Sequence, residues 1–313
     1  MLDLSDLTPT SLRHIVGQRS VVEQVLVGVE AAFADNKKFD HSLLVGPPGV
    51  GKTALAKVIA DEMATEFTGI LGQSLKNRGD LNAILLDASD KSIVFIDEAH
   101  ELDRRLQTAL YLALDQRKLS LSSCRKDGVP SSVPLADFTL LLASTDEYCL
   151  LQPLRDRMKL VLRFDFYAVE DLTVIVRHRI RSLAWWVEED VIPLIAERAR
   201  GTPRVALRLL QSCRRVCRSE GESVVTRKHL QRACELEQLD CLGLGPTEQR
   251  YLHLVGQGSN RLNVLASILG LPPRTVSLVT EPFLIRAGLV VKDDEGKRRL
   301  TPSGREHLSK SCP

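Results

Sequence analysis

The sequence predicts an α/β protein: a parallel β-sheet with helices on both faces, then an α-helical unit and a C-terminal winged helix. Three observations support this prediction. In the first half, short runs of consecutive apolar residues alternate with helical stretches, as parallel strands buried on both faces do. From about residue 169 the apolar spacing is purely helical. Residues 245–313 combine helices with two short β-rich runs that bracket a turn.

The strands of the core are the first elements to place. They are expected at the apolar runs of residues 41–45, 92–96, 138–143 and 160–164. Between them, helices are expected from Lys52 to about Thr65 and over residues 104–117. We therefore assign residues 1–167 to the core.

The segment at residues 119–134 interrupts this alternation. Asp127-Gly128 is a hairpin-turn signal, and the residues around it partly alternate in polarity. We therefore expect a β-hairpin insertion at about residues 119–134. A compact domain rarely keeps such an excursion without a use, so we expect the hairpin to contact a partner. The apolar candidates for contact with a partner are Val129, Val133 and Leu135.

Two smaller units follow the core. A four-helix unit is expected in residues 168–243, with helices at 171–182, 190–200, 203–220 and 226–237. A winged helix is expected in residues 244–313, because three helices precede a strand-turn-strand. These elements are expected at 247–255, 263–269, 273–280, 288–292 and 297–301.

Composition excludes several classes of protein. Hydrophobic residues make up 44% and charged residues 26%, as in ordinary globular proteins. No run of 18 apolar residues occurs and the N-terminus is acidic, so we expect no membrane span, no signal peptide and a cytoplasmic location. Seven cysteines without a C-x-x-C pair argue against a zinc ribbon or a disulfide framework.

The charge distribution is informative although the net charge is only +2. Residues 177–232 hold 13 Lys and Arg against 6 Asp and Glu, and residues 245–313 hold 10 against 6. This excess is compatible with a polyanionic partner and equally with solvated helix faces.

The motif with the clearest chemistry runs from Gly46 to Thr53 and fits the P-loop pattern G-x-x-x-x-G-K-T. The glycines Gly46, Gly49 and Gly51 let backbone N–H groups close around phosphate oxygens at the positive end of a helix. Lys52 is expected to hold the β- and γ-phosphates, and the Thr53 hydroxyl to hold Mg²⁺.

Asp97 and Glu98 come directly after the buried strand at 92–96. Asp97 is expected to hold Mg²⁺ through water, and Glu98 to polarise the attacking water. A P-loop followed by an Asp-Glu strand end is typical of nucleoside triphosphatases and not of kinases or small GTPases.

Hydrolysis also needs a polar group near the γ-phosphate and a positive charge for the transition state. Thr145, at the end of the strand after the hairpin, is a candidate γ-phosphate sensor. Arg155 and Arg157 follow shortly afterwards, and Arg204 begins a helix of the four-helix unit.

The residues that carry a family resemblance extend over nearly the whole chain. They are Leu7-Thr8-Pro9, Ile15-Val16-Gly17-Gln18, Asp40-His41, the P-loop, Phe95-Ile96-Asp97-Glu98-Ala99-His100, Pro153-Leu154-Arg155-Asp156-Arg157, Arg200-Gly201-Thr202-Pro203-Arg204 and residues 281–289. On these residues the chain resembles the RuvB family, which are AAA+ motors that drive branch migration of Holliday junctions.

The resemblance implies a P-loop AAA+ ATPase core, a helical lid and a winged-helix DNA-binding domain. It implies ATP and Mg²⁺ as cofactors. It also implies that the subunits assemble into a ring, by resemblance a hexamer, on duplex DNA beside a junction. It also implies RuvA as the junction-binding partner, docked on the hairpin, and RuvC resolvase as a further partner.

The resemblance also implies roles for individual residues. Lys52, Thr53, Asp97 and Glu98 take the roles given above, and Thr145 becomes the first sensor. Arg157 matches an arginine finger received by a neighbouring subunit, and Arg204 matches a second sensor. Leu7, Ala54 and Tyr167 match nucleotide-contacting positions of the family. Ala54 stands where the family has a second hydroxyl residue in the P-loop. The expected DNA-binding residues are Lys292, Lys297, Arg298 and Arg299.

Departures from the family pattern mark the chain as a divergent member. They are Thr8, Ala54, Asp146, Asp115-Gln116-Arg117 and the lack of Gly-x-Gly-Pro at the start of the hairpin. Two other functions stay open. One is a clamp-loader-like switch, which would need a sliding-clamp partner. The other is an ATP-regulated winged-helix regulator, which would read a DNA sequence without junction preference.

Overall fold

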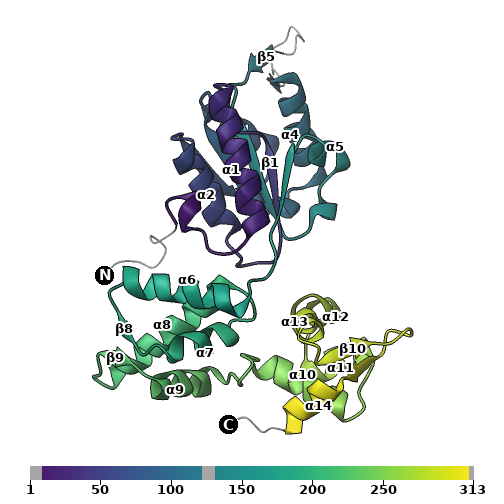
Figure 1. The fold of residues 1–313 in the computed structure, drawn as a ribbon. Helices are drawn as coiled ribbons and strands as arrows, with labels where there is room; N and C mark the ends of the chain where they lie inside the picture. The colour runs from purple at the N-terminus through teal and green to yellow at the C-terminus, as the bar shows by residue number, and fades with distance from the viewer. Residues whose placement is uncertain (1–8, 122–130, 310–313) are drawn as a thin grey trace. The chain divides into compact units, whose positions relative to one another are not determined.

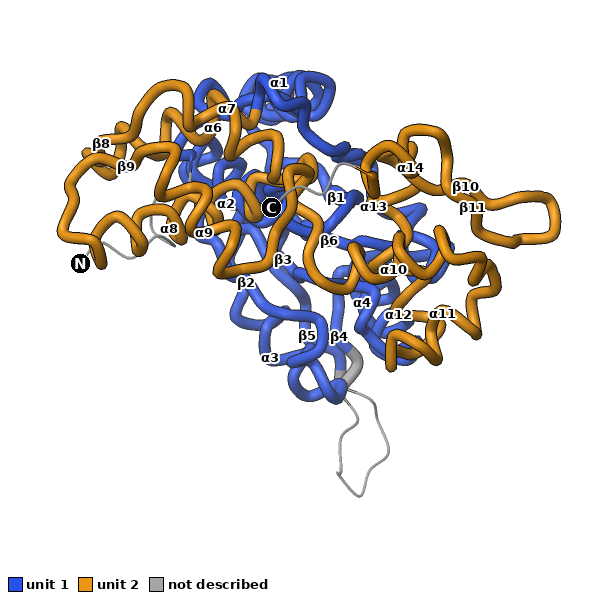
Figure 2. Tube along the Cα trace, turned by 90° about the horizontal axis from the view of Figure 1, so that it is seen from below, with its two compact units in different colours: residues 1–171 blue, residues 172–313 orange. Residues whose placement is uncertain are grey.

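The computed structural model describes residues 9–121 and 131–309. The chain forms two compact units, Met1–Asp171 and Leu172–Pro313, which Figure 2 colours separately. Each unit is described by itself below.

The first unit contains the parallel sheet expected from the sequence. Its described strands lie in the order β2-β3-β6-β1-β7, and every neighbouring pair is parallel. The strands are β1 (Ser42–Val45), β2 (Phe67–Leu71), β3 (Ile93–Asp97), β6 (Thr139–Ser144) and β7 (Leu160–Arg163). The edge strand β2 was not expected, because Gly69 and exposed residues break its apolar pattern.

Helices cover both faces of this sheet (Figure 1). They are α1 (Arg19–Ala34), α2 (Lys52–Glu62), α3 (Arg78–Asp87), α4 (Arg104–Gln116) and α5 (Gln152–Arg155), with short turns η2 (Leu12–His14), η3 (Gly72–Ser74), η4 (Ala99–Glu101) and η5 (Glu147–Cys149). Successive strand residues point to opposite faces. Leu44 and Phe95 thus pack in the cluster with α1 and α2, whereas Leu43 and Ile96 pack in the cluster with α3 and α4.

The expected hairpin is confirmed by two antiparallel strands, β4 (Lys118–Leu121) and β5 (Ser131–Pro134), which pair Leu119 with Val133. Its turn, with Val129, lies outside the described residues. Leu135 was expected among the apolar contacts for a partner, and the structure corrects this. Leu135 follows β5, is half-buried and packs against the core, so it belongs to the base of the hairpin.

The second unit begins with the four expected helices, α6 (Val169–Ser182), α7 (Val191–Glu197), α8 (Pro203–Ser219) and α9 (Arg227–Glu237). The expectation of a purely helical segment was wrong. Two short strands, β8 (Trp186–Val187) and β9 (Val224–Val225), pair in parallel between these helices. Two residues each are too few to produce an alternating pattern in the sequence.

The winged helix contains the expected elements and one more. It comprises α10 (Pro246–Gly256), α11 (Leu262–Leu269), α12 (Pro273–Thr275), the π-helical segment η6 (Val276–Thr280), α13 (Glu281–Arg286), β10 (Val290–Lys292), β11 (Arg298–Leu300) and α14 (Pro302–Ser309). The third helix thus continues from Pro273 to Arg286, beyond the expected end at residue 280. The short α14 was not expected, because Leu308 is its only large apolar residue.

Within residues 9–121 and 131–309, no single helix has the length and apolar character needed to cross a membrane. One bent pair, Leu262–Leu269 with Pro273–Arg286, meets those two criteria when taken together.

Candidate nucleotide site and DNA-binding surface

The P-loop joins the end of β1 to the start of α2, as expected from its sequence. Gly49 and Gly51 have φ values of +80° and +104°, which glycine adopts without steric cost. A Cβ on Gly46 would lie 2.7 Å from the carbonyl oxygen of Phe164, so the loop needs glycine for a close approach. The backbone therefore has the shape of a phosphate cradle at a helix N-terminus.

Lys52 occupies the first position of α2, and only 6% of its surface is exposed. Its Nζ donates hydrogen bonds to the carbonyl oxygens of Gly46 (2.7 Å) and Pro47 (2.9 Å). The ammonium group thus lies against the P-loop, where it is expected to bind the phosphates.

Thr53 and Asp97 are brought together although they are far apart in sequence. The Thr53 hydroxyl donates to Oδ2 of Asp97 at 2.7 Å. The contact arises because β1 and β3 are parallel and both flank β6, so that their carboxyl ends meet at one edge of the sheet. A hydroxyl and a carboxylate are hard oxygen ligands that suit Mg²⁺, and the donor set therefore fits this ion.

Glu98 follows in the left-handed backbone region, with φ +50°. Its Oε2 is buried and has no hydrogen bond among the described residues. His100 Nδ1 lies 3.3 Å from this oxygen and 3.3 Å from the hydroxyl of Ser144. The carboxylate therefore has little direct solvation on one side, which suits a group that accepts a proton from water.

Thr145 is exposed directly after β6, beside the P-loop edge. The preceding carbonyl, that of Ser144, accepts a hydrogen bond from the Gly46 N–H at 3.2 Å. The strand that presents Thr145 is therefore bonded to the loop.

Tyr167 also lies against the P-loop, where its hydroxyl donates to the carbonyl oxygen of Val50 at 3.2 Å. Burial raises the pKa of Tyr167 to about 12. Gln18, which the motifs did not mark as functional, is hydrogen-bonded to the backbone of Asp165 on the same side. Ala54 is half-buried in α2 and Leu7 lies outside the described residues.

The candidate arginines are found elsewhere. Arg157 follows α5, and its guanidinium is ion-paired at 2.8 Å with Asp115, near the end of α4. Arg204 is exposed in the first turn of α8, in the second unit.

The cations of the wing divide into two kinds. Glu281 is fully buried and accepts hydrogen bonds from Arg298 (2.8 and 3.2 Å) and from the Tyr251 hydroxyl (2.9 Å), while Lys292 Nζ lies 2.7 Å away. Burial would raise the pKa of Glu281, but hydrogen bonds from Arg298, Lys292 and Tyr251 lower it overall. The guanidinium of Arg298 is largely buried against Glu281, although the residue also lines the cavity described below, so a DNA contact by Arg298 stays a prediction. Lys292, engaged with the same carboxylate, supports the fold as well.

Arg299 and Lys297 are different, because their partners, the half-buried Asp293 and the exposed Glu295, are not fully buried as Glu281 is. Arg299 is 67% exposed and pairs with Asp293 at 2.9 Å, and Lys297 pairs with the exposed Glu295. Ion pairs that are partly exposed to solvent are weak, so these two cations can exchange their partners for phosphate contacts.

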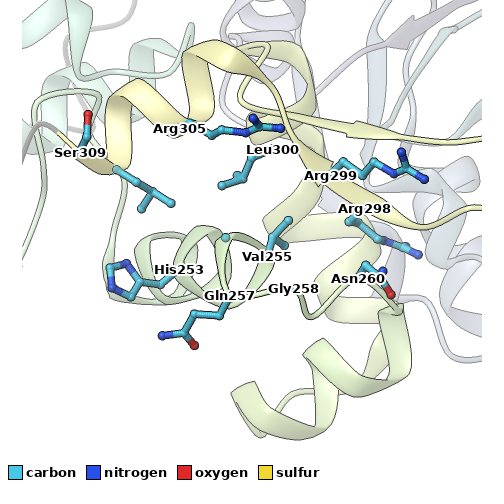
Figure 3. Close-up of a pocket in the computed structure, with 12 residues that line it drawn as sticks. His253, Val255, Gln257, Gly258, Asn260, Arg298, Arg299, Leu300, Arg305 and Ser309 are labelled. Atoms are coloured by element: carbon cyan, nitrogen blue, oxygen red, sulfur yellow. The ribbon is translucent and has the colours of Figure 1, made fainter.

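A cavity of about 620 Å³ lies beside the wing (Figure 3). Its polar lining includes His253, Gln257, Asn260, Arg299 and Arg305. Figure 3 shows these side chains coming from α10, the following loop, β11 and α14. The cavity therefore continues the basic surface of the wing.

The fold and the site together define a P-loop nucleoside triphosphatase of the AAA+ class that also carries a winged helix. Three family models match the chain: the Holliday junction DNA helicase RuvB P-loop domain over residues 7–164, the RuvB AAA lid domain over 167–240, and the RuvB C-terminal winged helix domain over 241–309. The chain belongs to the RuvB family.

Similar proteins of known name agree with this membership. The chain is 34% identical over 307 residues to the Holliday junction branch migration complex subunit RuvB of Kosmotoga olearia, covering 96% of this chain and 90% of that protein. It is 36% identical to the protein of the same name from Koribacter versatilis, covering 93% and 82%. The solved structure of the Thermotoga maritima RuvB Holliday junction branch migration motor superposes with a TM-score of 0.83, at 32% identity, over 98% of this chain and 99% of that one.

Proposed function

We propose that this chain is an ATP-dependent DNA motor that drives branch migration of Holliday junctions in recombination and repair. The observation that carries the proposal is the Thr53–Asp97 contact beside Glu98 and the P-loop, in a RuvB-family chain that also has a winged helix. We divide the motor into a core at 1–167, a lid at 168–243 and a DNA-binding domain at 244–313.

The ATPase chemistry follows from the site. Lys52 and the P-loop backbone hold the phosphates of ATP, and Thr53 and Asp97 hold Mg²⁺, which neutralises charge on the phosphates when it is bound. Glu98 orients and polarises the attacking water, and Thr145 senses the γ-phosphate. Tyr167, Ala54 and Leu7 line the nucleotide side of the site.

A ring of subunits, most simply a hexamer, completes the site. Arg157 enters the nucleotide site of a neighbouring subunit, and Arg204 reaches the γ-phosphate from the lid. Two cations of the wing, Arg299 and Lys297, bind the phosphates of duplex DNA. Arg305 extends this basic surface in the adjoining cavity.

The partners of the motor are part of the proposal. RuvA docks on the hairpin of β4 and β5 and delivers the junction, and RuvC acts on the same junction. A motor on chromosomal junctions works where the chromosome is, so the proposal includes a cytoplasmic location.

ATP turnover with and without synthetic four-way junctions and RuvA tests the proposal. We expect junction DNA together with RuvA to stimulate turnover more than linear duplex does. Stimulation by a sliding clamp instead would indicate a clamp-loader-like switch. Sequence-specific footprints on random DNA, without junction preference, would indicate a regulator.

A further inference from the structure

The guanidinium of Arg157 is held at two points by one carboxylate. Nη2 donates to Asp115 Oδ2 at 2.8 Å, and Nε donates to Asp115 Oδ1 at 3.3 Å. Nη1 donates to the carbonyl oxygen of Pro153 at 3.1 Å. The hydrogen bonding that Arg157 donates to Asp115 raises the pKa of Arg157, so the group stays charged.

Tyr111 adds a second constraint from the same helix. It precedes Asp115 by about one turn of α4, and the centre of its ring lies 5.7 Å from the guanidinium carbon. The helix itself is rigidly seated, because Leu106, Leu110 and Ala113 are buried in the core. The end of α4 is therefore a fixed platform for the Arg157 side chain.

Arg155, the other arginine of this segment, has no carboxylate partner within residues 9–121 and 131–309. It contacts Gln152 on its own short helix and stacks over the exposed Tyr148, at 5.4 Å from the ring centre. Its Nε has no hydrogen bond among the described residues. Of the two arginines, only Arg157 has its orientation set by a carboxylate in the described part of the chain.

A guanidinium has five N–H donors, and the three bonds described above use three of them. Among the described residues, one donor on Nη1 and one on Nη2 are left for another group. A long arginine side chain loses about 2 kcal/mol of rotamer entropy when it is fixed. Fixing it in advance removes part of that cost from the step in which it meets a phosphate.

We propose that Asp115 is a positioning residue: it fixes the Arg157 guanidinium in the orientation that presents two donors to the nucleotide of a neighbouring subunit. The inference rests on the finger role in the proposed function. It adds a residue from α4 to the apparatus, located just before the hairpin on which RuvA is proposed to dock.

Steady-state ATP turnover of the assembled protein with junction DNA tests this role. We expect Asp115→Ala to lower kcat about 10²-fold, the scale of a misplacement of about 1 Å, while KM for ATP and thermal stability stay close to wild type. Asp115→Glu keeps the charge and should recover part of the loss. Asp137→Asn is the matched control, since it removes an exposed acid that pairs with Arg117, at the same end of α4, and with Lys38, and should change kcat less than twofold.

The double variant separates positioning from other effects. Arg157→Ala with Asp115→Ala should be no slower than Arg157→Ala alone, because Asp115 acts only through Arg157. A further loss in the double variant, or faster turnover in Asp115→Asn, would overturn the positioning role. Normal turnover of Asp115→Ala beside an impaired Arg157→Ala would overturn positioning alone. Normal turnover of Arg157→Ala would overturn the finger role and the positioning role together.

Discussion

At the scale of single residues, Asp97 and Glu98 are neighbours in sequence with different surroundings. The Asp97 carboxylate is bonded to the Thr53 hydroxyl, whereas one oxygen of Glu98 is buried without a hydrogen bond among the described residues. The Asp97 environment suits a metal ligand, and the unbonded Glu98 oxygen suits a group that orients the attacking water. This division of labour predicts that binding and turnover can be separated.

We expect Lys52→Ala to abolish ATP binding, because it removes the cation from the phosphate cradle. Glu98→Gln should keep binding within a few-fold and lose turnover by at least about 10²-fold, the scale of general-base catalysis. Nucleotide titration by fluorescence and phosphate release measure the two quantities. Wild-type turnover in Glu98→Gln would remove Glu98 from the chemistry.

The wing offers a second comparison of neighbouring residues. Arg298→Ala leaves the buried Glu281 without one of its two cations and should destabilise the winged helix by about 3–5 kcal/mol. Arg299→Ala removes an exposed cation and should leave stability unchanged. It should instead weaken DNA binding and lower the slope of log affinity against log salt by about one.

Urea unfolding and salt-dependent DNA titrations of the two variants decide between these roles. A stable Arg298→Ala protein with a reduced salt slope would place Arg298 on the DNA surface. The sequence could not separate the two arginines, because they are adjacent and chemically identical. The distinction depends on Glu281, which comes from a different element and lies within an apolar stretch.

At the scale of elements, prediction succeeded where a long contiguous sequence pattern marks the element. It failed where the strand is very short or lies exposed at the edge of the sheet. The strands that carry the site are continuous apolar runs, and the P-loop is one contiguous motif, so both could be predicted. The strands β8 and β9 have two residues each, and β2 is an exposed edge strand. Such elements are fixed by pairing with distant segments, which periodicity does not reveal.

The hairpin illustrates both outcomes. Its two strands were predictable from the turn signal, but the place of Leu135 depends on packing against the core. Val129, which directly follows the turn signal in sequence, and Val133 remain the candidates for contact with RuvA.

We expect Val129→Glu to spare intrinsic ATPase activity and to abolish its stimulation by RuvA, because a charge would have to be buried in an apolar contact. Ser132→Glu is the matched control, since Ser132 is an exposed hairpin residue and should tolerate the charge. Stimulation measured with increasing RuvA reports the result. Unchanged stimulation in Val129→Glu would leave the hairpin without a role in docking.

At the scale of the whole molecule, the second unit joins the lid to the winged helix by several polar contacts. Arg200 bonds to Glu248 at 2.8 Å and to the Gly243 carbonyl at 2.7 Å, and His307 lies 2.9 Å from Asp240. A Cβ on Gly243 would lie 2.1 Å from the carbonyl oxygen of Arg198, so glycine is required where the two parts meet. Movement of the lid is therefore expected to carry the DNA-binding domain with it.

We expect Glu248→Ala with His307→Ala to loosen this joint. ATP turnover should stay within about threefold of wild type, because neither residue lies in the first unit, while branch migration per ATP falls at least about tenfold as lid motion is no longer transmitted. Parallel assays of phosphate release and junction movement give this ratio. An unchanged ratio would show that the joint transmits no motion.

The most direct test of the central claim is the ATP-dependent dissociation of a labelled synthetic four-way junction into forked duplexes. The reaction contains the chain, RuvA, ATP and Mg²⁺, and the Glu98→Gln chain is the matched control. We predict rapid dissociation by the wild-type chain, and dissociation by Glu98→Gln no faster than without ATP. A wild-type chain that binds the junction and hydrolyses ATP, yet dissociates it no faster than Glu98→Gln, would contradict the assignment as a branch migration motor.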